Sequence, residues 1–210
     1  MIKKNKLQII ITSIATVLPV VIGLILWDQM PEQVAIHWGL NGEPDSYGHK
    51  AVAVFVLPVV LLAVHLICVF ASRLDPKHKD MNPKLFSLVL WICPAISIIM
   101  NTMVYLISIG KEVKFVMIII LFMGLMFVVI GNYLPKCTHS YTMGIKLPWT
   151  LADEDNWNKT HRFSGPLWVI GGIVIIVTAI FESPVIFFSV VALMMIIPTV
   201  YSYCYYKKHQ

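Results

Sequence analysis

Residues 115–134 read F-V-M-I-I-I-L-F-M-G-L-M-F-V-V-I-G-N-Y-L and decide the fold of this chain. They include no Asp, Glu, Lys or Arg, and a helix that rises ~1.5 Å per residue crosses the ~30 Å hydrocarbon core of a bilayer at this length. Five more uncharged blocks are long enough to cross as well: 7–27, 51–72, 85–109, 163–181 and 184–206. The sequence therefore predicts an all-α polytopic membrane protein, a bundle of six transmembrane helices.

The composition excludes a soluble domain. Of 210 residues, 58% are hydrophobic and 13% are charged, which is too apolar for a core covered by a polar shell. We therefore interpret residues 1–210 as a single six-helix membrane domain that has lipid as its main solvent. The fifth block is the weakest, because its apolar part from Pro166 to Phe181 is only 16 residues long. It needs residues 163–165, or local thinning of the bilayer, to cross.

The basic residues predict the orientation. With six spans, the side that holds both chain ends carries 13 Lys and Arg residues, and the opposite side carries three, Lys50, Lys111 and Lys114. Because basic residues accumulate in short loops on the cytoplasmic side, both termini are predicted to be cytoplasmic. This topology also accounts for the net charge of +5, so no direct nucleic-acid partner is expected.

Residues 28–50 form the longer loop on the predicted extracytoplasmic face. Their prolines, their glycines and the Asn41-Gly42 turn signal predict a compact structure such as a short hairpin. The loop has four acidic residues and one lysine, so its net charge is −3. A negative surface of this kind suits a cationic partner.

Residues 131–165 form the longer loop on the cytoplasmic face. Thr150 and Asp153 stand three apart, as at the start of a helix, and Arg162 favours the C-terminal end of that helix. The Gly-Pro pair at 165–166 is expected to break it. The sequence therefore predicts a short interfacial helix with Trp157 turned toward the lipid headgroups.

The sequence contains no familiar pattern for catalysis or for a cofactor. H-E-x-x-H, G-x-S-x-G and G-x-x-x-x-G-K-[ST] are absent, and the spans contain no acidic residue. We expect a protein that is not an enzyme, with no cofactor and no metal. Four outer-loop residues have the right chemistry for zinc but match no familiar zinc spacing: His37, Glu43, Asp45 and His49. Within the spans, His65 is expected to bond a neighbouring helix, and Asn101, Thr102 and Thr178 to form interhelical hydrogen bonds.

Motifs in the two loops resemble a known family. The inner loop contains G-N-Y-L-P-K at 131–136, G-I-K-L-P-W-T-L at 144–151 and W-N-K-T-H-R at 157–162. These resemble the signature of the SdpI family of bacterial membrane proteins. The stretch 31–50, followed by a span with Pro58, looks like the small N-terminal domain of unassigned function often found in that family. The resemblance covers essentially the whole chain, with one departure, Ser140, where an asparagine is expected.

The resemblance implies a membrane immunity protein of a Gram-positive bacterium, which protects against a secreted antimicrobial peptide toxin. It also implies signal transduction, because the family's named member sequesters a cytoplasmic autorepressor at the membrane when toxin is present. The expected partners are the lipid bilayer, a secreted peptide toxin and a cytoplasmic repressor protein. The alternative function is a small-solute or peptide transporter or channel, which polar groups along a continuous cavity would favour.

Two sets of candidate site residues follow from these motifs. The candidate toxin-binding residues belong to the outer loop: His37, Trp38, Asn41, Gly42, Asp45, Tyr47 and Lys50. The candidate regulator-binding residues belong to the inner loop: Asn132, Pro135, Gly144, Pro148, Trp149, Thr150, Trp157, Thr160, His161 and Arg162.

Overall fold

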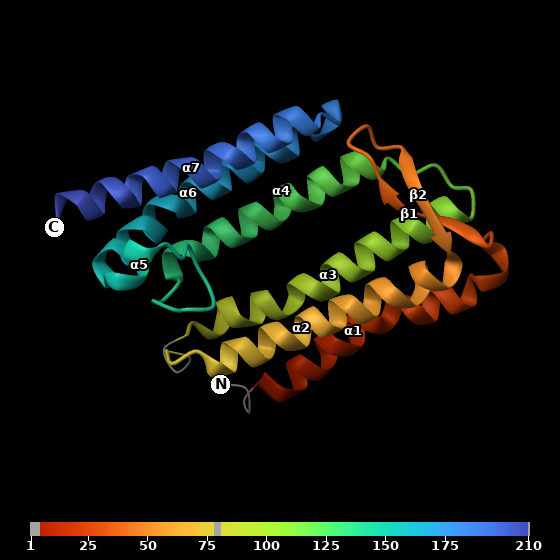
Figure 1. Ribbon diagram of the computed structural model, residues 1–210, viewed down its shortest axis with the longest axis horizontal. Helices are drawn as coiled ribbons and strands as arrows, with labels where there is room; N and C mark the ends of the chain where they lie inside the picture. Colours follow the sequence, from red (N-terminus) through yellow and green to blue (C-terminus); the bar gives the residue numbers. More distant parts are fainter. Residues whose placement is uncertain (1–4, 78–80, 210) are drawn as a thin grey trace. The chain divides into compact units, whose positions relative to one another are not determined.

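The computed structural model describes residues 5–77 and 81–209. Among these residues, six helices are long and apolar enough to cross a membrane. They are α1 (Lys6–Ile25), α2 (Leu57–Leu74), α3 (Pro83–Ser108), α4 (Phe115–Tyr133), α6 (Glu154–Thr178) and α7 (Pro184–Lys208), as Figure 1 shows. They coincide with the six uncharged blocks, so the prediction of six membrane-spanning helices is confirmed.

Shorter elements connect these helices. The outer loop contains the 3-10 turn η2 (Trp27–Gln29) and the strands β1 (Gln33–Trp38) and β2 (Pro44–His49). A π-helical turn, η3 (Val52–Val56), leads into α2. The inner loop contains the 3-10 turn η4 (Leu134–Lys136) and the short helix α5 (Pro148–Ala152), and η5 (Ala179–Phe181) follows α6. The expected hairpin is confirmed, and it forms the one sheet among the described residues.

The helices pack as two compact units. One comprises the described residues of Met1–Leu74 and Phe86–Phe115, and the other comprises those of Asp75–Leu85 and Val116–Gln210. The first unit therefore contains α1, the hairpin, α2 and most of α3. The second contains α4 from Val116 onward, together with α5, α6 and α7, while Phe115 belongs to the first unit.

Polar side chains join the helices of the first unit. Ser97 on α3 donates a hydrogen bond to the carbonyl of Thr16 on α1 at 2.6 Å, and both side chains are fully buried. His65 on α2 lies 3.2 Å from the Thr12 hydroxyl on α1. The expectation that His65 bonds a neighbouring helix is therefore confirmed. Such bonds satisfy polar groups that lipid cannot.

Two other expectations for polar residues in the spans are wrong. The Asn101 side-chain amide donates to the Ser97 carbonyl of its own helix at 2.8 Å, and the Thr178 hydroxyl donates to the Val174 carbonyl of its own helix at 2.8 Å. Neither forms the expected interhelical bond, because a carbonyl one turn back lies within reach of the side chain. Thr102 is exposed on α3.

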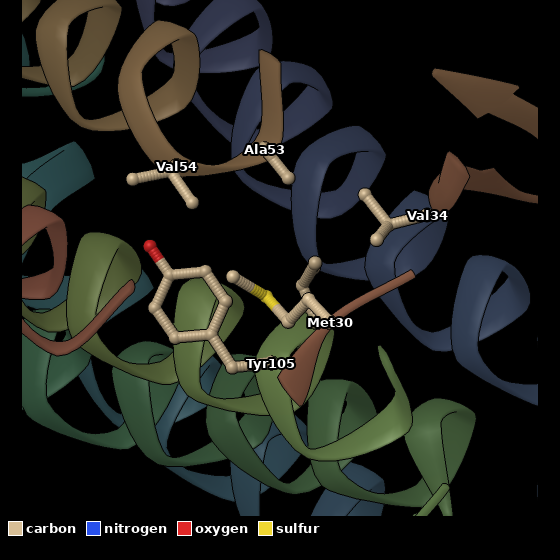
Figure 2. Close-up of a cluster of buried hydrophobic side chains, with 6 residues drawn as sticks. Met30, Val34, Ala53, Val54 and Tyr105 are labelled. Atoms are coloured by element: carbon tan, nitrogen blue, oxygen red, sulfur yellow. The ribbon is translucent and has the colours of Figure 1, made fainter. Parts of the chain in front are cut away.

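An apolar cluster fixes the hairpin to the first unit. Met30, Val34, Ala53, Val54 and Tyr105 are buried together, and Figure 2 shows their side chains converging from the outer loop, η3 and α3. The Tyr105 hydroxyl donates to the Pro19 carbonyl of α1 at 3.1 Å. The hairpin is thus anchored by buried side chains that lie outside its turn.

In the second unit, glycines bring α4 and α6 into backbone contact. A Cβ atom at Gly165 would lie 3.0 Å from the Gly131 carbonyl oxygen and 2.5 Å from Pro135. About two helical turns away, a Cβ atom at Gly172 would lie 2.7 Å from the Gly124 carbonyl oxygen. Close approach of this kind is typical of membrane helices with small residues at their interface. α6 also packs along α7 (Figure 1).

The predicted break at residues 165–166 is wrong. α6 runs from Glu154 to Thr178 with Pro166 inside it, so the fifth span is longer than its apolar part suggested. Its N-cap is Asp153, whose carboxylate accepts a hydrogen bond from the Asp155 N–H at 2.9 Å, and not Thr150, which belongs to α5. Proline is tolerated in a membrane helix where neighbouring groups pack against it, and Gly165 is needed here for its contact with α4.

Candidate functional site

The inner-loop motif folds around Trp157, which is fully buried. The expectation that Trp157 faces lipid headgroups is therefore wrong. Its indole N–H donates to the Cys137 carbonyl at 3.0 Å, and its ring stacks on the His161 ring with centroids 4.1 Å apart. The centroid of the His139 ring lies 5.0 Å from that of the Trp157 ring. Loop residues 137–145 thus cover the face of α6 that the sequence assigned to lipid.

The buried His161 ring links α6 to this loop. Its Nε2 accepts the Ile145 N–H at 2.8 Å, so its Nδ1 carries the proton and donates to the Trp157 carbonyl at 2.7 Å. Gly144 precedes this bond with φ +119°. A Cβ atom there would lie 2.6 Å from His161 Nε2 and 2.6 Å from the Trp157 ring. The glycine of one inner motif and the Trp-His pair of the next therefore form one packed structure.

Thr150 closes the turn between the loop and α5. Its buried hydroxyl lies within hydrogen-bond distance of the Ile145 and Leu147 carbonyls, at 2.9 and 3.0 Å, and accepts the Leu147 N–H at 2.9 Å. Beside it, the half-buried Trp149 donates from its indole N–H to the Ser202 hydroxyl on α7 at 2.9 Å. The P-W-T-L stretch is thus held by both the loop and α7.

A chain of polar contacts continues along α6. The buried Asn156 amide donates to the Ser202 carbonyl at 3.1 Å, and the Thr160 hydroxyl donates to Asn156 Oδ1 at 3.0 Å. Ser164 donates in turn to the Thr160 carbonyl at 2.6 Å. Thr160 therefore supports Asn156, whose amide joins α6 to α7.

Asp75 is a central residue of the inner cluster that the sequence did not identify. It is 3% exposed, and its Oδ2 accepts from the Ser140 hydroxyl at 2.6 Å, the Tyr141 N–H at 2.9 Å and the Thr142 N–H at 3.0 Å. Burial alone would raise the pKa of this carboxyl, but these bonds and one from the Lys77 N–H outweigh it and lower the pKa. Asp75 is therefore an ionised anchor for the loop.

Ser140, the position at which the resemblance implied an asparagine, joins Asp75 to the loop. Its hydroxyl donates to Asp75 and accepts the Met143 N–H at 3.2 Å, so it connects the anchor to the loop. Nearby, burial raises the pKa of the Cys137 thiol to about 12. This thiol is protonated at neutral pH and lies in a closed environment.

The remaining inner-motif candidates lie at the surface. Asn132, Pro135, Pro148 and Arg162 are exposed. The inner motif thus comprises a buried scaffold of Thr150, Trp157, Thr160 and His161, two half-buried residues, Gly144 and Trp149, and an exposed set. The exposed set is the part most open to direct contact with a partner.

The outer-loop hairpin has the turn that the sequence predicted. Gly42 has φ +79° and donates its N–H to the Gly39 carbonyl at 2.9 Å. The exposed Asn41 side chain accepts the Glu43 N–H at 3.2 Å. The strands pair antiparallel, with an irregular register between Ala35 and Trp38. A positive φ at Gly42 explains the glycine there.

Two of the outer candidates anchor the loop. Trp38 stacks on Phe115 with centroids 4.2 Å apart. Lys50 is buried: its ammonium lies 3.0 Å from the Glu32 carboxylate, donates to the Trp27 carbonyl at 3.2 Å and sits 4.9 Å from the Trp27 ring centroid. The hydrogen bond and charge of Lys50 lower the pKa of Glu32. Lys50 is therefore engaged within the chain.

The other outer candidates are open to solvent. His37 Nδ1 lies 2.5 Å from the Asp45 carboxylate, and both side chains are at least half exposed. Tyr47 is 61% exposed. Among the described residues, no three His, Cys, Asp or Glu side chains gather as metal ligands would. The hairpin therefore offers a polar and aromatic surface with exposed carboxylates.

Comparison with known proteins matches both regions. The family model of the SdpI/YfhL protein family matches residues 136–202, and that of a domain of unknown function (DUF1648) matches residues 14–62. The chain is 31% identical over 209 residues to a Bacillus subtilis (strain 168) protein named "Immunity protein SdpI", covering 98% of this chain and 97% of that protein. No solved structure matches.

Proposed function

This chain belongs to the SdpI family, and from that premise we propose that it is a membrane immunity protein that protects its cell against a secreted antimicrobial peptide toxin. The observation that carries the proposal is the 31% identity to an immunity protein over nearly the full length of both chains. That match covers both loops and all six candidate spans.

The outer hairpin is the surface we assign to the toxin. With both termini in the cytoplasm, as the distribution of basic residues favours, the hairpin lies outside. Its exposed carboxylates, Glu43 and Asp45, suit a cationic peptide, and the exposed Tyr47 adds an aromatic contact. Because the Lys50 and Trp38 contacts hold the strands in place, binding costs little ordering of the loop.

The inner motif is the surface we assign to a cytoplasmic regulator. Arg162 is exposed on α6, close in sequence to the buried scaffold of Trp157 and His161. Arginine is a frequent anchor at protein interfaces. In this proposal the buried residues hold the loop in shape, and the exposed residues contact the repressor.

The test of immunity is deletion and re-expression in the native host. Cells that lack the chain are challenged with the secreted peptides of the host and its neighbours, and growth is measured with and without the chain restored. We expect restoration to protect against at least one peptide. Indifference to every peptide, together with uptake of a solute that depends on the chain, would replace immunity with transport.

The regulator surface has its own test. Arg162→Ala should reduce membrane recruitment of a fluorescent repressor while toxin resistance and membrane abundance stay near wild type. Lys159→Ala is the matched control, because this exposed lysine is already engaged by Asp155 at 3.2 Å and by Tyr205 at 3.0 Å. Normal recruitment by Arg162→Ala at normal abundance would remove Arg162 from the proposed surface.

A further inference from the structure

A cavity of about 190 Å³ lies in the second unit, between the loop Gly144–Leu147 and helices α6 and α7. Trp168 contributes a wall from α6, and Met194, Met195 and Pro198 contribute walls from α7. These side chains are apolar. The Thr199 hydroxyl at the cavity donates to the Met195 carbonyl of its own helix at 2.8 Å, so it needs no partner within the cavity.

Lys146 is the charged residue among those lining the cavity. Its side chain is exposed, and its ammonium donates one long hydrogen bond, of 3.4 Å, to the Thr142 carbonyl. Within the part of the chain that the structure describes, no carboxylate forms an ion pair with it. A lysine whose exposed ammonium has spare donors therefore lines the apolar cavity.

The cavity continues along the outside of α7. A shallow depression lined by Met195, Ile196, Thr199 and Val200 shares Met195 and Thr199 with it. Met195, Ile196 and Val200 are each more than half exposed, on a helix long and apolar enough to span the membrane. Acyl chains are the medium around such a face, so an acyl chain that lies in the depression adjoins the cavity.

The position of the cavity along α7 places Lys146 near the lipid headgroups. The tyrosines Tyr201 and Tyr203 follow Thr199 within about one turn, and Lys207 and Lys208 end the helix. Tyrosines are enriched where the hydrocarbon core meets the headgroups. Lys146 lines the cavity together with Pro198 and Thr199, so its flexible side chain can reach a lipid phosphate while an acyl chain in the cavity meets Trp168.

From this geometry we propose that the cavity is a binding site for an anionic phospholipid. One acyl chain enters the cavity between the loop and Trp168, and the Lys146 ammonium binds the phosphate. The occupant is a lipid rather than a free phosphate, because the walls are apolar and open along a membrane-facing helix. This inference does not depend on the proposed immunity function.

The test uses the purified full-length protein in detergent micelles, titrated with phosphatidylglycerol or phosphatidylcholine, with bound lipid counted by native mass spectrometry. One interfacial lysine contributes ~1 kcal/mol toward an anionic lipid, so wild type should prefer phosphatidylglycerol about fivefold. Lys146→Gln should remove this preference. Lys146→Arg should keep it, as should Lys136→Gln, the control at another exposed lysine.

A second variant tests the position of the acyl chain in the cavity. Thr199→Leu places a larger side chain at the cavity and should weaken the binding of both lipids to the same extent. Glycerol phosphate, a headgroup without acyl chains, should not compete with lipid binding. Retained preference in Lys146→Gln would overturn the role of the lysine. Undiminished binding in Thr199→Leu would overturn the acyl-chain position, and competition by glycerol phosphate at similar concentration would reduce the site to a phosphate contact.

Discussion

Gly144→Ala should open the inner cluster and expose Cys137. Two effects act at this position. With φ +119°, the backbone is in a region that residues other than glycine rarely adopt, and the added Cβ atom would lie 2.6 Å from both the Trp157 ring and His161 Nε2. Neither neighbour moves freely, because Trp157 donates to Cys137 and His161 accepts from Ile145.

The magnitude follows from these two effects. Backbone strain of this kind costs ~1–3 kcal/mol, and insertion of one carbon into a packed core costs ~1–3 kcal/mol. Their sum is ~2–6 kcal/mol, and even the lower value raises the population of an open cluster about 30-fold. Gly110→Ala is the matched control: its φ is +79° but no atom lies within 4 Å of the added Cβ, so it carries strain of only ~1–2 kcal/mol.

The assay measures labelling of the Cys137 thiol by a maleimide in purified protein whose other three cysteines are replaced by alanine. Cys137 is 5% exposed, and burial raises the pKa of its thiol to about 12, so labelling requires opening. Gly144→Ala should label at least tenfold faster than wild type, and Gly110→Ala at close to the wild-type rate. Equal rates for wild type and Gly144→Ala, at equal melting temperature, would refute the packing argument.

Three further outcomes are expected. Because the pKa of Asp75 is lowered in the folded state, its contribution to stability is present above the unfolded pKa of ~3.9 and is lost as pH falls through the folded value. The melting temperature of Asp75→Asn should therefore be lower than that of wild type near pH 7, and it should depend less on pH below ~4. If the melting temperatures of the two proteins instead changed with pH in parallel, Asp75 would not be the ionised anchor of the loop. In whole cells an impermeant thiol reagent should label Ser46→Cys, which is exposed on β2, and should not label Asn158→Cys, which is exposed near the start of α6. The reverse labelling pattern would place both termini outside the cell. Gly42→Val should lower protection against the toxin or the protein level, because φ is +79° at this position and a β-branched side chain is poorly tolerated there. Wild-type protection at a wild-type protein level would show that the turn does not require glycine at position 42.

The sequence was sufficient for features that depend on local pattern. Six uncharged blocks predicted six spans because length and apolarity alone define a membrane helix. The turn at Gly42 followed from the Asn-Gly pair, whose backbone preference is a property of the two residues. The bond between His65 and a neighbouring helix followed from the cost of a polar ring in lipid.

The inner cluster depends on contacts that no local pattern encodes. Asp75 and Ser140 are 65 positions apart, and an acidic residue in a mainly basic loop gives no sign of its partner. The Gly-Pro pair at 165–166 is typical of a helix break, but Gly165 is required for the approach to Pro135 and Gly131, so tertiary packing outweighed the local signal. The spacing of Trp157 on its helix could not reveal that a loop covers it.

Survival of a sensitive strain that lacks any relative of this chain tests immunity most directly. The strain carries either the wild-type chain or the double variant Glu43→Gln, Asp45→Asn at matched membrane abundance, and both are exposed to increasing concentrations of the purified peptide against which the native host is protected. The account predicts that wild type shifts the killing curve to at least tenfold higher peptide concentration and that the neutralised hairpin loses most of this shift. A wild-type curve that superimposes on that of cells without the chain would contradict the immunity function.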